Sequence, residues 1–208
     1  MEPVPLFFWK SSAGVEPVRE WLYTLPRDEQ RAVGRDLAKM QFLWVRDVTA
    51  FPRVATGLWE VRAALSGRRM ARFLIADHDG RLIALSVVFG RTRKPPDADL
   101  EFARRRLNQV TERGKKRNSR VGSTFESWLD EQGIREEATA AAVKCVIAKQ
   151  LAFAMKRHRL SKPRVAELMQ TSRSEVDGLL DPDNSSATLE TLMRAAKVVG
   201  GQLRLELV

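Results

Sequence analysis

The chain has 208 residues, which is enough for one large domain or two small ones. Its formal net charge of +10 is high and indicates a polyanionic partner, such as nucleic acid, the ribosome or an acidic membrane surface. The charge is uneven: residues 1–117 hold 23 Lys and Arg against 14 Asp and Glu, whereas residues 118–208 hold 13 against 12. The first half therefore carries the basic surplus.

The composition also argues against several kinds of site. The single cysteine, Cys145, excludes an intramolecular disulfide and a cysteine-based metal site. Only two histidines occur, His78 and His158, so we expect neither a histidine-based metal site nor a cofactor. No run of about 18 apolar residues predicts a membrane span, and the N-terminus lacks the pattern of a secretion signal. We therefore expect a cytoplasmic protein with no membrane partner.

The first half begins with a pattern of strand, helix and helix. Alternating apolar residues predict a short strand at 4–8, and helical spacing predicts two helices that Leu25-Pro26 separates. Irregular structure is expected over 47–56. Three strands are then predicted, and short connections between them favour an antiparallel meander. These strands cover 58–64, 71–76 and 82–89.

Two turn and helix signals complete this half. Asp79-Gly80 predicts a tight hairpin turn, because both residues tolerate a positive φ. His78 is expected in this turn, exposed to solvent. After Pro95-Pro96, the acidic residues Asp97, Asp99 and Glu101 favour the start of a helix, where they face the positive end of its dipole.

The strand at 58–64 has two unlike faces. Alternation places Trp59 on an apolar face, which we expect to pack on the two helices. Glu60 and Arg62 share the opposite face, which we expect to be exposed. If the meander forms, several cations converge over that face: Arg62, Arg72, Arg91, Arg93 and Lys94.

Such a cluster suits metal-independent RNA cleavage. Arginines stay protonated and donate to the phosphoryl oxygens on which charge accumulates when a ribose 2′-OH attacks the adjacent phosphate. Glu60, or a lysine of unusual pKa, is the candidate general base. The alternative is a solvated sheet face with no chemistry, because charged runs are usually solvating.

The second half is predicted to be helical up to its last residues. Residues 113–122 are polar and basic and are interpreted as a linker between domains at 1–112 and 123–208. Ser123 and Glu126 have the spacing of a helix-capping box, and a long helix is expected over 136–158. The final "QLRLELV" alternates as a strand does. Pairing of that strand with its copy would give a homodimer.

Residues 160–180 have the pattern of a helix-turn-helix. Ser172 opens the second helix with Glu175 three residues later, again a capping box, and Gln170 stands where many such motifs have glycine. Arg173 is placed to bond a guanine edge in the major groove. The alternative is a structural helical hairpin that binds no DNA. The candidate DNA-binding residues are Lys162, Thr171, Ser172, Arg173 and Ser174.

Two resemblances follow from these stretches. "FESWLDEQGI", "AAVKCVIAKQLAFAM", "VAELMQTSRSEVDGLLDPDN" and "TLETLMRAAKVVGGQLRLELV" make residues 123–208 similar to antitoxins of the HigA type, which are helix-turn-helix proteins that repress their own operon. "GLWEVR", "RMARFLI" and "VFGRTRKPPDADLEFA" make residues 5–110 resemble toxins of the HigB type in the RelE superfamily. Such toxins are small α+β ribonucleases that commonly cut mRNA on the ribosome.

The resemblance to the toxins implies a set of site residues, and the sequence departs from the family pattern at two places. Arg62, the basic cluster of Arg91, Arg93 and Lys94, and Arg72 beside them occupy the implied site. Ile75 stands about where the family usually has a tyrosine, and Arg91-Thr92-Arg93 stands where it often has paired lysines. These departures remove possible proton-transfer groups.

The prediction is therefore a toxin–antitoxin module in one chain. An α+β, RelE-like domain with N-terminal helices on an antiparallel sheet precedes an all-α helix-turn-helix domain with a short C-terminal strand. The first domain is expected to be an mRNA endoribonuclease that depends on the ribosome, and the second to bind operator DNA and repress transcription. The two halves are expected to make contact, in cis or in trans, through residues 123–158. The alternative is a DNA-binding regulator whose toxin-like half is inactive.

Overall fold

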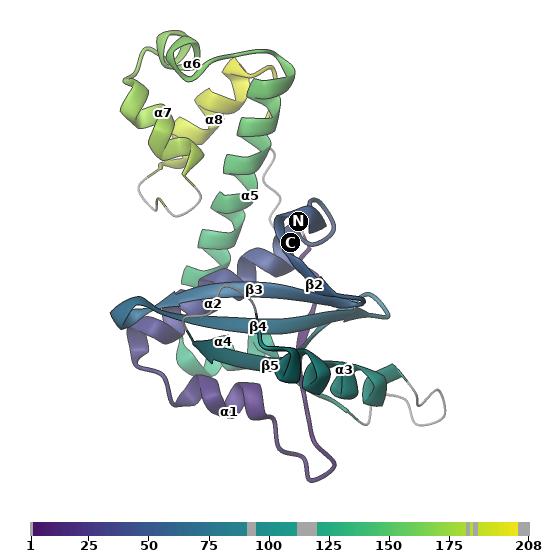
Figure 1. Ribbon diagram of the computed structural model, residues 1–208. Coiled ribbons are helices and arrows are strands. Elements are labelled where there is room, and N and C mark those ends of the chain that lie inside the picture. The colour runs from purple at the N-terminus through teal and green to yellow at the C-terminus, as the bar shows by residue number, and fades with distance from the viewer. Residues whose placement is uncertain (1, 91–94, 112–119, 182–183, 185–186, 204–208) are drawn as a thin grey trace. The chain divides into compact units, whose positions relative to one another are not determined.

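The computed structural model describes residues 2–90, 95–111, 120–181, 184 and 187–203. Within these residues, eight α-helices, two short 3-10 helices and a six-stranded mixed sheet form an α+β fold (Figure 1). The chain divides into two compact units, Met1–Thr139 and Ala140–Val208. The sequence placed the junction at 113–122, where the composition changes. In the structure the boundary between the two units follows Thr139, because residues 121–139 pack with the first unit.

The first unit is built on a sheet with the strand order β2-β3-β4-β5-β1-β6. Its centre is the predicted meander, now observed as β3 (Leu58–Leu65), β4 (Arg69–His78) and β5 (Arg81–Gly90), all antiparallel. Asp79 and Gly80 form the predicted turn with φ values of 52° and 71°. A 3-10 turn at Ser66–Arg68 joins β3 to β4.

Three shorter strands extend this sheet. β1 (Leu6–Trp9) is parallel to β5, and β2 (Arg53–Ala55) is antiparallel to β3 within the segment predicted to be irregular. β6 (Val121–Thr124) is antiparallel to β1 and begins at the end of the predicted linker. The expectation of an all-helical second half up to its last residues was therefore wrong.

Helices cover the two faces of the sheet (Figure 1). α1 (Pro17–Tyr23) and α2 (Arg27–Leu43) form on either side of Leu25-Pro26 as predicted, and α4 (Phe125–Gln132) lies with them. Trp21 of α1 contacts Phe73 edge to face, and Trp44, which follows α2, contacts Trp59 in the same way at 4.9 Å. Trp59 thus lies on the helix-covered face, as expected, and is half-buried there.

α3 (Asp97–Thr111) covers the opposite face and begins with the expected acidic residues. Its apolar side chains pack with one buried cluster that includes Leu58, Leu74, Ile83 and Ala103. Adjacent strand residues point to opposite faces, so Leu74 faces α3 while Phe73 faces α1. This packing positions the candidate site, which lies on the α3 face.

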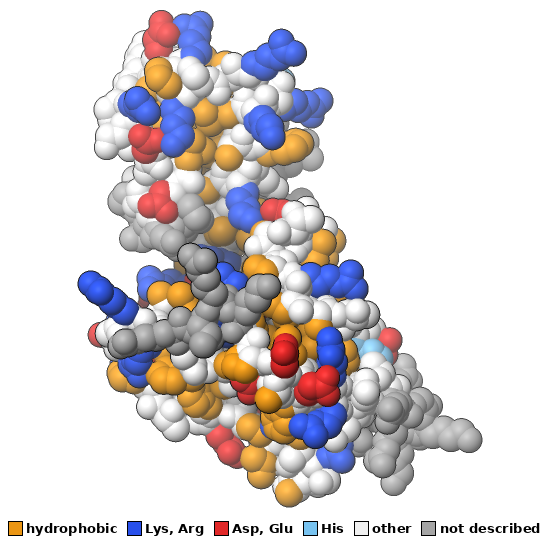
Figure 2. Space-filling model, viewed as in Figure 1, with side chains coloured by type: hydrophobic (Ala, Val, Ile, Leu, Met, Phe, Trp, Pro, Cys, Tyr) orange, Lys and Arg blue, Asp and Glu red, His pale blue; other side chains and the backbone are white. Residues whose placement is uncertain are grey.

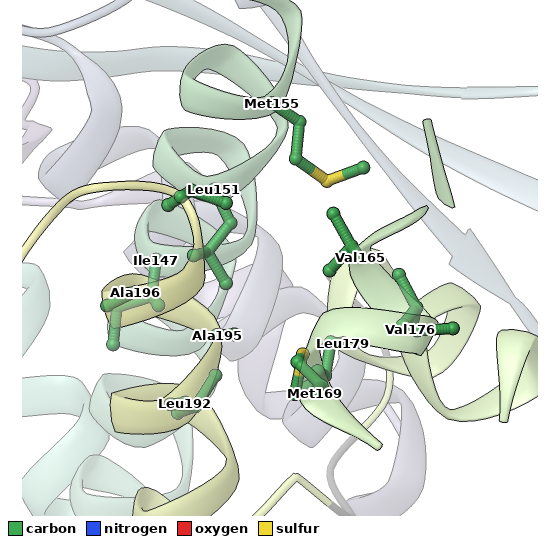
Figure 3. Close-up of a cluster of buried hydrophobic side chains, with 12 residues drawn as sticks. Ile147, Leu151, Met155, Val165, Met169, Val176, Leu179, Leu192, Ala195 and Ala196 are labelled. Atoms are coloured by element: carbon green, nitrogen blue, oxygen red, sulfur yellow. The ribbon is translucent and has the colours of Figure 1, made fainter. Parts of the chain in front are cut away.

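The second unit is a bundle of helices. α5 (Arg135–Arg157) begins in the first unit and continues into the second, where α6 (Lys162–Met169), α7 (Arg173–Leu180) and α8 (Leu189–Val198) pack with it. Figure 3 shows apolar side chains of all four helices converging on one core. The labelled residues are Ile147, Leu151, Met155, Val165, Met169, Val176, Leu179, Leu192, Ala195 and Ala196.

Two further expectations concern this half. α5 alone, among the described helices, is long and apolar enough by length and composition to span a bilayer. The core helix of a soluble protein passes the same test, and Ile147, Leu151 and Met155 of α5 are buried in the bundle.

The predicted C-terminal strand falls mostly on residues 204–208, which lie outside the described residues, so the strand and the dimer built on it stay predictions.

Candidate nucleic-acid interfaces

Glu60, Arg62 and Arg72 form a hydrogen-bonded cluster on the α3 face of the sheet. Arg62 and Arg72 are directly opposite each other on β3 and β4, and Glu60 precedes Arg62 by two residues on the same face. The Glu60 carboxylate accepts from both guanidinium groups: Arg62 Nη2 lies 2.8 Å from Oε2, and Arg72 Nη1 donates to Oε1. The structure thus brings together three of the six residues predicted for catalysis.

Burial differs sharply within this cluster. Glu60 is 1% exposed and Arg72 is 5% exposed, whereas the Arg62 side chain is 46% exposed. The hydrogen bond that Arg62 donates to the Glu60 carboxylate raises the pKa of Arg62 above its ordinary value, so Arg62 keeps its charge. The cluster therefore presents one oriented guanidinium to solvent above a buried ion pair.

Two expectations about this face need correction. The Glu60–Arg62 face was predicted to be exposed, but Glu60 lies between the fully buried Leu58 and Leu74, where α3 packs on the sheet. Strand alternation cannot reveal this, because a distant helix provides the cover. Glu60 is also poorly placed as a general base, since both its oxygens already accept hydrogen bonds from arginines.

The other predicted cations, Arg91, Arg93 and Lys94, lie outside the described residues. β5 ends at Gly90, and α3 begins at Asp97. Gly90 pairs with Met70, two residues before Arg72 on β4. The chain therefore leaves the sheet near the arginine cluster, although the prediction for these three side chains stays a prediction.

The opposite face carries an arginine–aromatic surface that the sequence analysis missed. Arg69 lies over the ring of Phe89 at 5.4 Å, and Phe89 is 51% exposed and 6.5 Å from Trp21. Glu29 holds Arg69 and also accepts from the Ser66 hydroxyl and from the Ser66 amide at 3.0 Å. These hydrogen bonds lower the pKa of Glu29 below its ordinary value of 4.5, and the bond from the Ser66 hydroxyl has the largest effect. The run "VVFG" does not alternate between apolar and polar residues, so nothing in the sequence indicated that Phe89 is exposed.

Arg106 of α3 is a second feature that the sequence analysis missed. Its guanidinium lies 4.1 Å from the ring centroids of both Trp9 and Phe102, and it donates to the Leu85 carbonyl. Burial lowers the pKa of Arg106 to about 10. Such a residue fastens α3 to the sheet, and its position inside the unit removes one cation from the surface charge.

In the second unit, α6 and α7 are joined by a three-residue turn, 170–172. Gln170 adopts the left-handed conformation with φ 53°, the position at which the sequence pattern expects glycine. The Ser172 hydroxyl caps α7 by accepting from the Glu175 amide at 3.1 Å, as predicted. The prediction that Ser123 caps a helix was wrong, because Thr124 caps α4 and the Ser123 hydroxyl donates to Glu16 instead.

Of the five residues predicted to contact DNA, three make contacts within the unit and two point outward. Lys162 donates to Asp177 at 2.5 Å, and Thr171 donates to Glu175, so both are engaged within the unit. Ser172 is the cap described above. Arg173 and Ser174 point outward at the start of α7, and the Arg173 side chain is 70% exposed and 3.9 Å from Asp177.

Asp177 is thus shared by two cations. The hydrogen bond from Lys162, helped by Arg173, lowers the pKa of Asp177 below its ordinary value. Figure 2 shows Lys and Arg side chains spread over the visible face of the second unit, with fewer acidic ones among them. Any phosphate bound near α7 therefore meets exposed cations beside one local carboxylate.

No group of three or more His, Cys, Asp or Glu able to hold a metal ion occurs among the described residues. The chemistry that the described part of the chain offers near β3 and β4 is electrostatic: a fixed guanidinium on a sheet face. Such a group binds phosphate oxygens through paired N–H donors.

The comparisons with known proteins bear on the first unit. Residues 20–108 match the family described as phage derived protein Gp49-like (DUF891), a RelE-like toxin family of toxin–antitoxin systems. No curated protein and no solved structure matches the chain. The match runs from α1 through the meander to α3, and so contains Glu60, Arg62 and Arg72. Over that stretch, the first unit is similar to the Gp49-like family of toxins.

Proposed function

We propose that this chain is a toxin–antitoxin module in a single polypeptide, in which the first unit is an mRNA endoribonuclease and the second binds operator DNA. The observation that carries the first part is the exposed Arg62 guanidinium, fixed by buried Glu60 within the segment similar to a toxin family. The resemblance of residues 123–208 to HigA-type antitoxins supports the second part. The ribosome is the expected setting for cleavage.

In this proposal Arg62 donates to the phosphoryl oxygens of the scissile phosphate. The ribose 2′-oxygen forms a bond to phosphorus while the bond from phosphorus to the 5′-oxygen breaks, and the 2′-hydroxyl proton is finally carried by the leaving 5′-oxygen. A fixed donor matters most in the transition state, where the charge on the phosphoryl oxygens is largest. Glu60 is then a positioning residue that orients Arg62, and Arg91, Arg93 and Lys94 supply further donors.

Expression of residues 1–139 in cells tests the first part. This fragment keeps the whole first unit, whereas a fragment that ends at 112 would lose β6 and α4. We expect growth arrest with mRNA cut at defined positions, and the same fragment with Arg62→Ala should be folded and harmless. Normal growth with a folded wild-type fragment would reject the ribonuclease.

For the second unit we propose that the start of α7 enters the major groove. The Arg173 side chain is 70% exposed and stands at the N-terminal end of the helix. Arg173→Ala should weaken binding to the DNA upstream of the coding sequence by about tenfold to 100-fold. Arg164→Ala is the matched control, because Arg164 is exposed on α6 and pairs with Glu167.

One observation favours a second candidate function. Two of the three charged groups at the cluster are buried and neutralise each other, which is what a structural ion pair does. In this alternative, the first unit is an inactive accessory of a DNA-binding regulator. It predicts operator binding by the full chain together with harmless expression of residues 1–139.

A further inference from the structure

Residues 120–134 join the first unit as an added strand followed by a helix. β6 pairs with the edge of β1, with Trp9 opposite Val121 and Phe7 opposite Thr124. The Lys10 amide extends this pairing by donating to the Arg120 carbonyl at 2.9 Å. Strand addition to an open sheet edge is a common way in which proteins recognise extended peptides.

Apolar side chains of the same segment fill the space beside α2. Phe125 and Trp128 are completely buried and stacked on each other with ring centroids 5.7 Å apart, and Phe125 also contacts Phe8 of β1. A Cβ added to Gly34 of α2 would lie 3.2 Å from both Leu129 and Ile134. The helix therefore approaches α2 as closely as a glycine permits.

A ring of polar contacts surrounds these anchors. Arg19 donates to Glu131 at 2.6 Å and to Ser123 at 2.6 Å, and Tyr23 donates to Glu131. Burial, together with the bond to Glu131, raises the pKa of Tyr23. Aromatic anchors inside a polar rim are the anatomy of an interface between two proteins. The other contacts of this ring join Glu16 to Ser123, Arg27 to Gln132 and Gln41 to Glu126.

We propose that the first 111 residues carry a docking site for a strand–helix ligand, and that residues 120–134 are that ligand, held by contacts that survive cutting of the covalent connection. The connection then serves to raise the local concentration of the ligand to about millimolar. α4 lies on the α1–α2 face, whereas Arg62 is 46% exposed on the α3 face. The docked segment therefore leaves Arg62 open, and the proposal stands whether or not the first unit cuts RNA.

The test uses the full chain, with residues 113–118 replaced by the recognition sequence of a specific protease. After complete cutting, gel filtration at about 1 µM should show the two fragments eluting together. They should separate in denaturant and rejoin when it is removed. Elution as two separate fragments under native conditions would overturn the proposal.

Neighbouring carboxylates provide a matched pair of variants. Glu131 bonds across the interface, whereas Asp130 pairs with Arg135 at 2.7 Å, on its own side of the cut, among the described residues. In the cut protein, Glu131→Ala should make the fragments dissociate about threefold faster, and Asp130→Ala should leave the rate unchanged. Phe125→Ala should increase dissociation by at least about 100-fold. Equal rates for the Glu131 and Asp130 variants would contradict docking through the polar ring.

Discussion

Replacement of Trp128 tests whether α4 is an integral part of the first unit. Trp128 is completely buried, stacks on Phe125 and lies 3.7 Å from the Cβ position of Gly34. Removal of a buried tryptophan side chain usually lowers the free energy of unfolding by about 3–5 kcal/mol. The Trp128 indole N–H is buried with no hydrogen-bond partner among the described residues, so its removal offsets part of this loss. We therefore expect a loss of about 3 kcal/mol for Trp128→Ala.

Tryptophan fluorescence during urea unfolding measures this effect selectively. All five tryptophans lie at or before residue 128, and therefore in the first unit. The midpoint of their transition should move to lower urea with little change in slope. Trp128→Phe is the control: it keeps an aromatic ring and removes the unpartnered N–H, so its loss should stay below about 1 kcal/mol. A loss below about 1 kcal/mol for the alanine variant, or equal losses for both variants, would refute the reasoning.

Three further predictions concern individual side chains. Glu60→Gln should lower the free energy of unfolding by about 3–5 kcal/mol in the same assay, because it leaves the buried Arg72 charge without its carboxylate; an unchanged midpoint would contradict a buried ion pair. The lowered pKa of Glu29 means that its contribution is present above pH 4.5 and is lost as the pH falls below that value. Glu29→Gln should therefore flatten the decline in stability on acidification, and a decline as steep as that of the wild type would count against the Ser66 and Arg69 contacts. Gln170→Gly should stabilise the second unit by about 0.5–1 kcal/mol in thermal unfolding followed by helical circular dichroism, since glycine adopts a positive φ more easily; destabilisation would indicate that the Gln170 side chain makes a needed contact.

Local patterns predicted much of the central architecture. The break at Leu25-Pro26, the Asp79-Gly80 turn and the Ser172 cap all rest on residues close in sequence, and each was found. These features depend on backbone preferences and nearby hydrogen bonds, which a short stretch of sequence contains.

Features that depend on distant segments were missed. The parallel pairing of β1 with β5 and the addition of β6 to β1 join parts of the chain that are about 75 and 115 residues apart. Glu60 was misjudged for the same reason, since α3 covers it and follows it by about 40 residues. Ser123 has the spacing of a cap, but its hydroxyl bonds to Glu16, which left Thr124 as the cap.

The central claim concerns Arg62, and cleavage of mRNA on purified ribosomes by residues 1–139 tests it most directly. Arg62→Ala should reduce the rate of cleavage by about 100-fold to 1,000-fold, as expected for loss of one transition-state donor. Arg104→Ala should cleave as the wild type does, because Arg104 is equally exposed and pairs with Glu101 on the outer side of α3. Equal cleavage by the Arg62 and Arg104 variants would contradict the account.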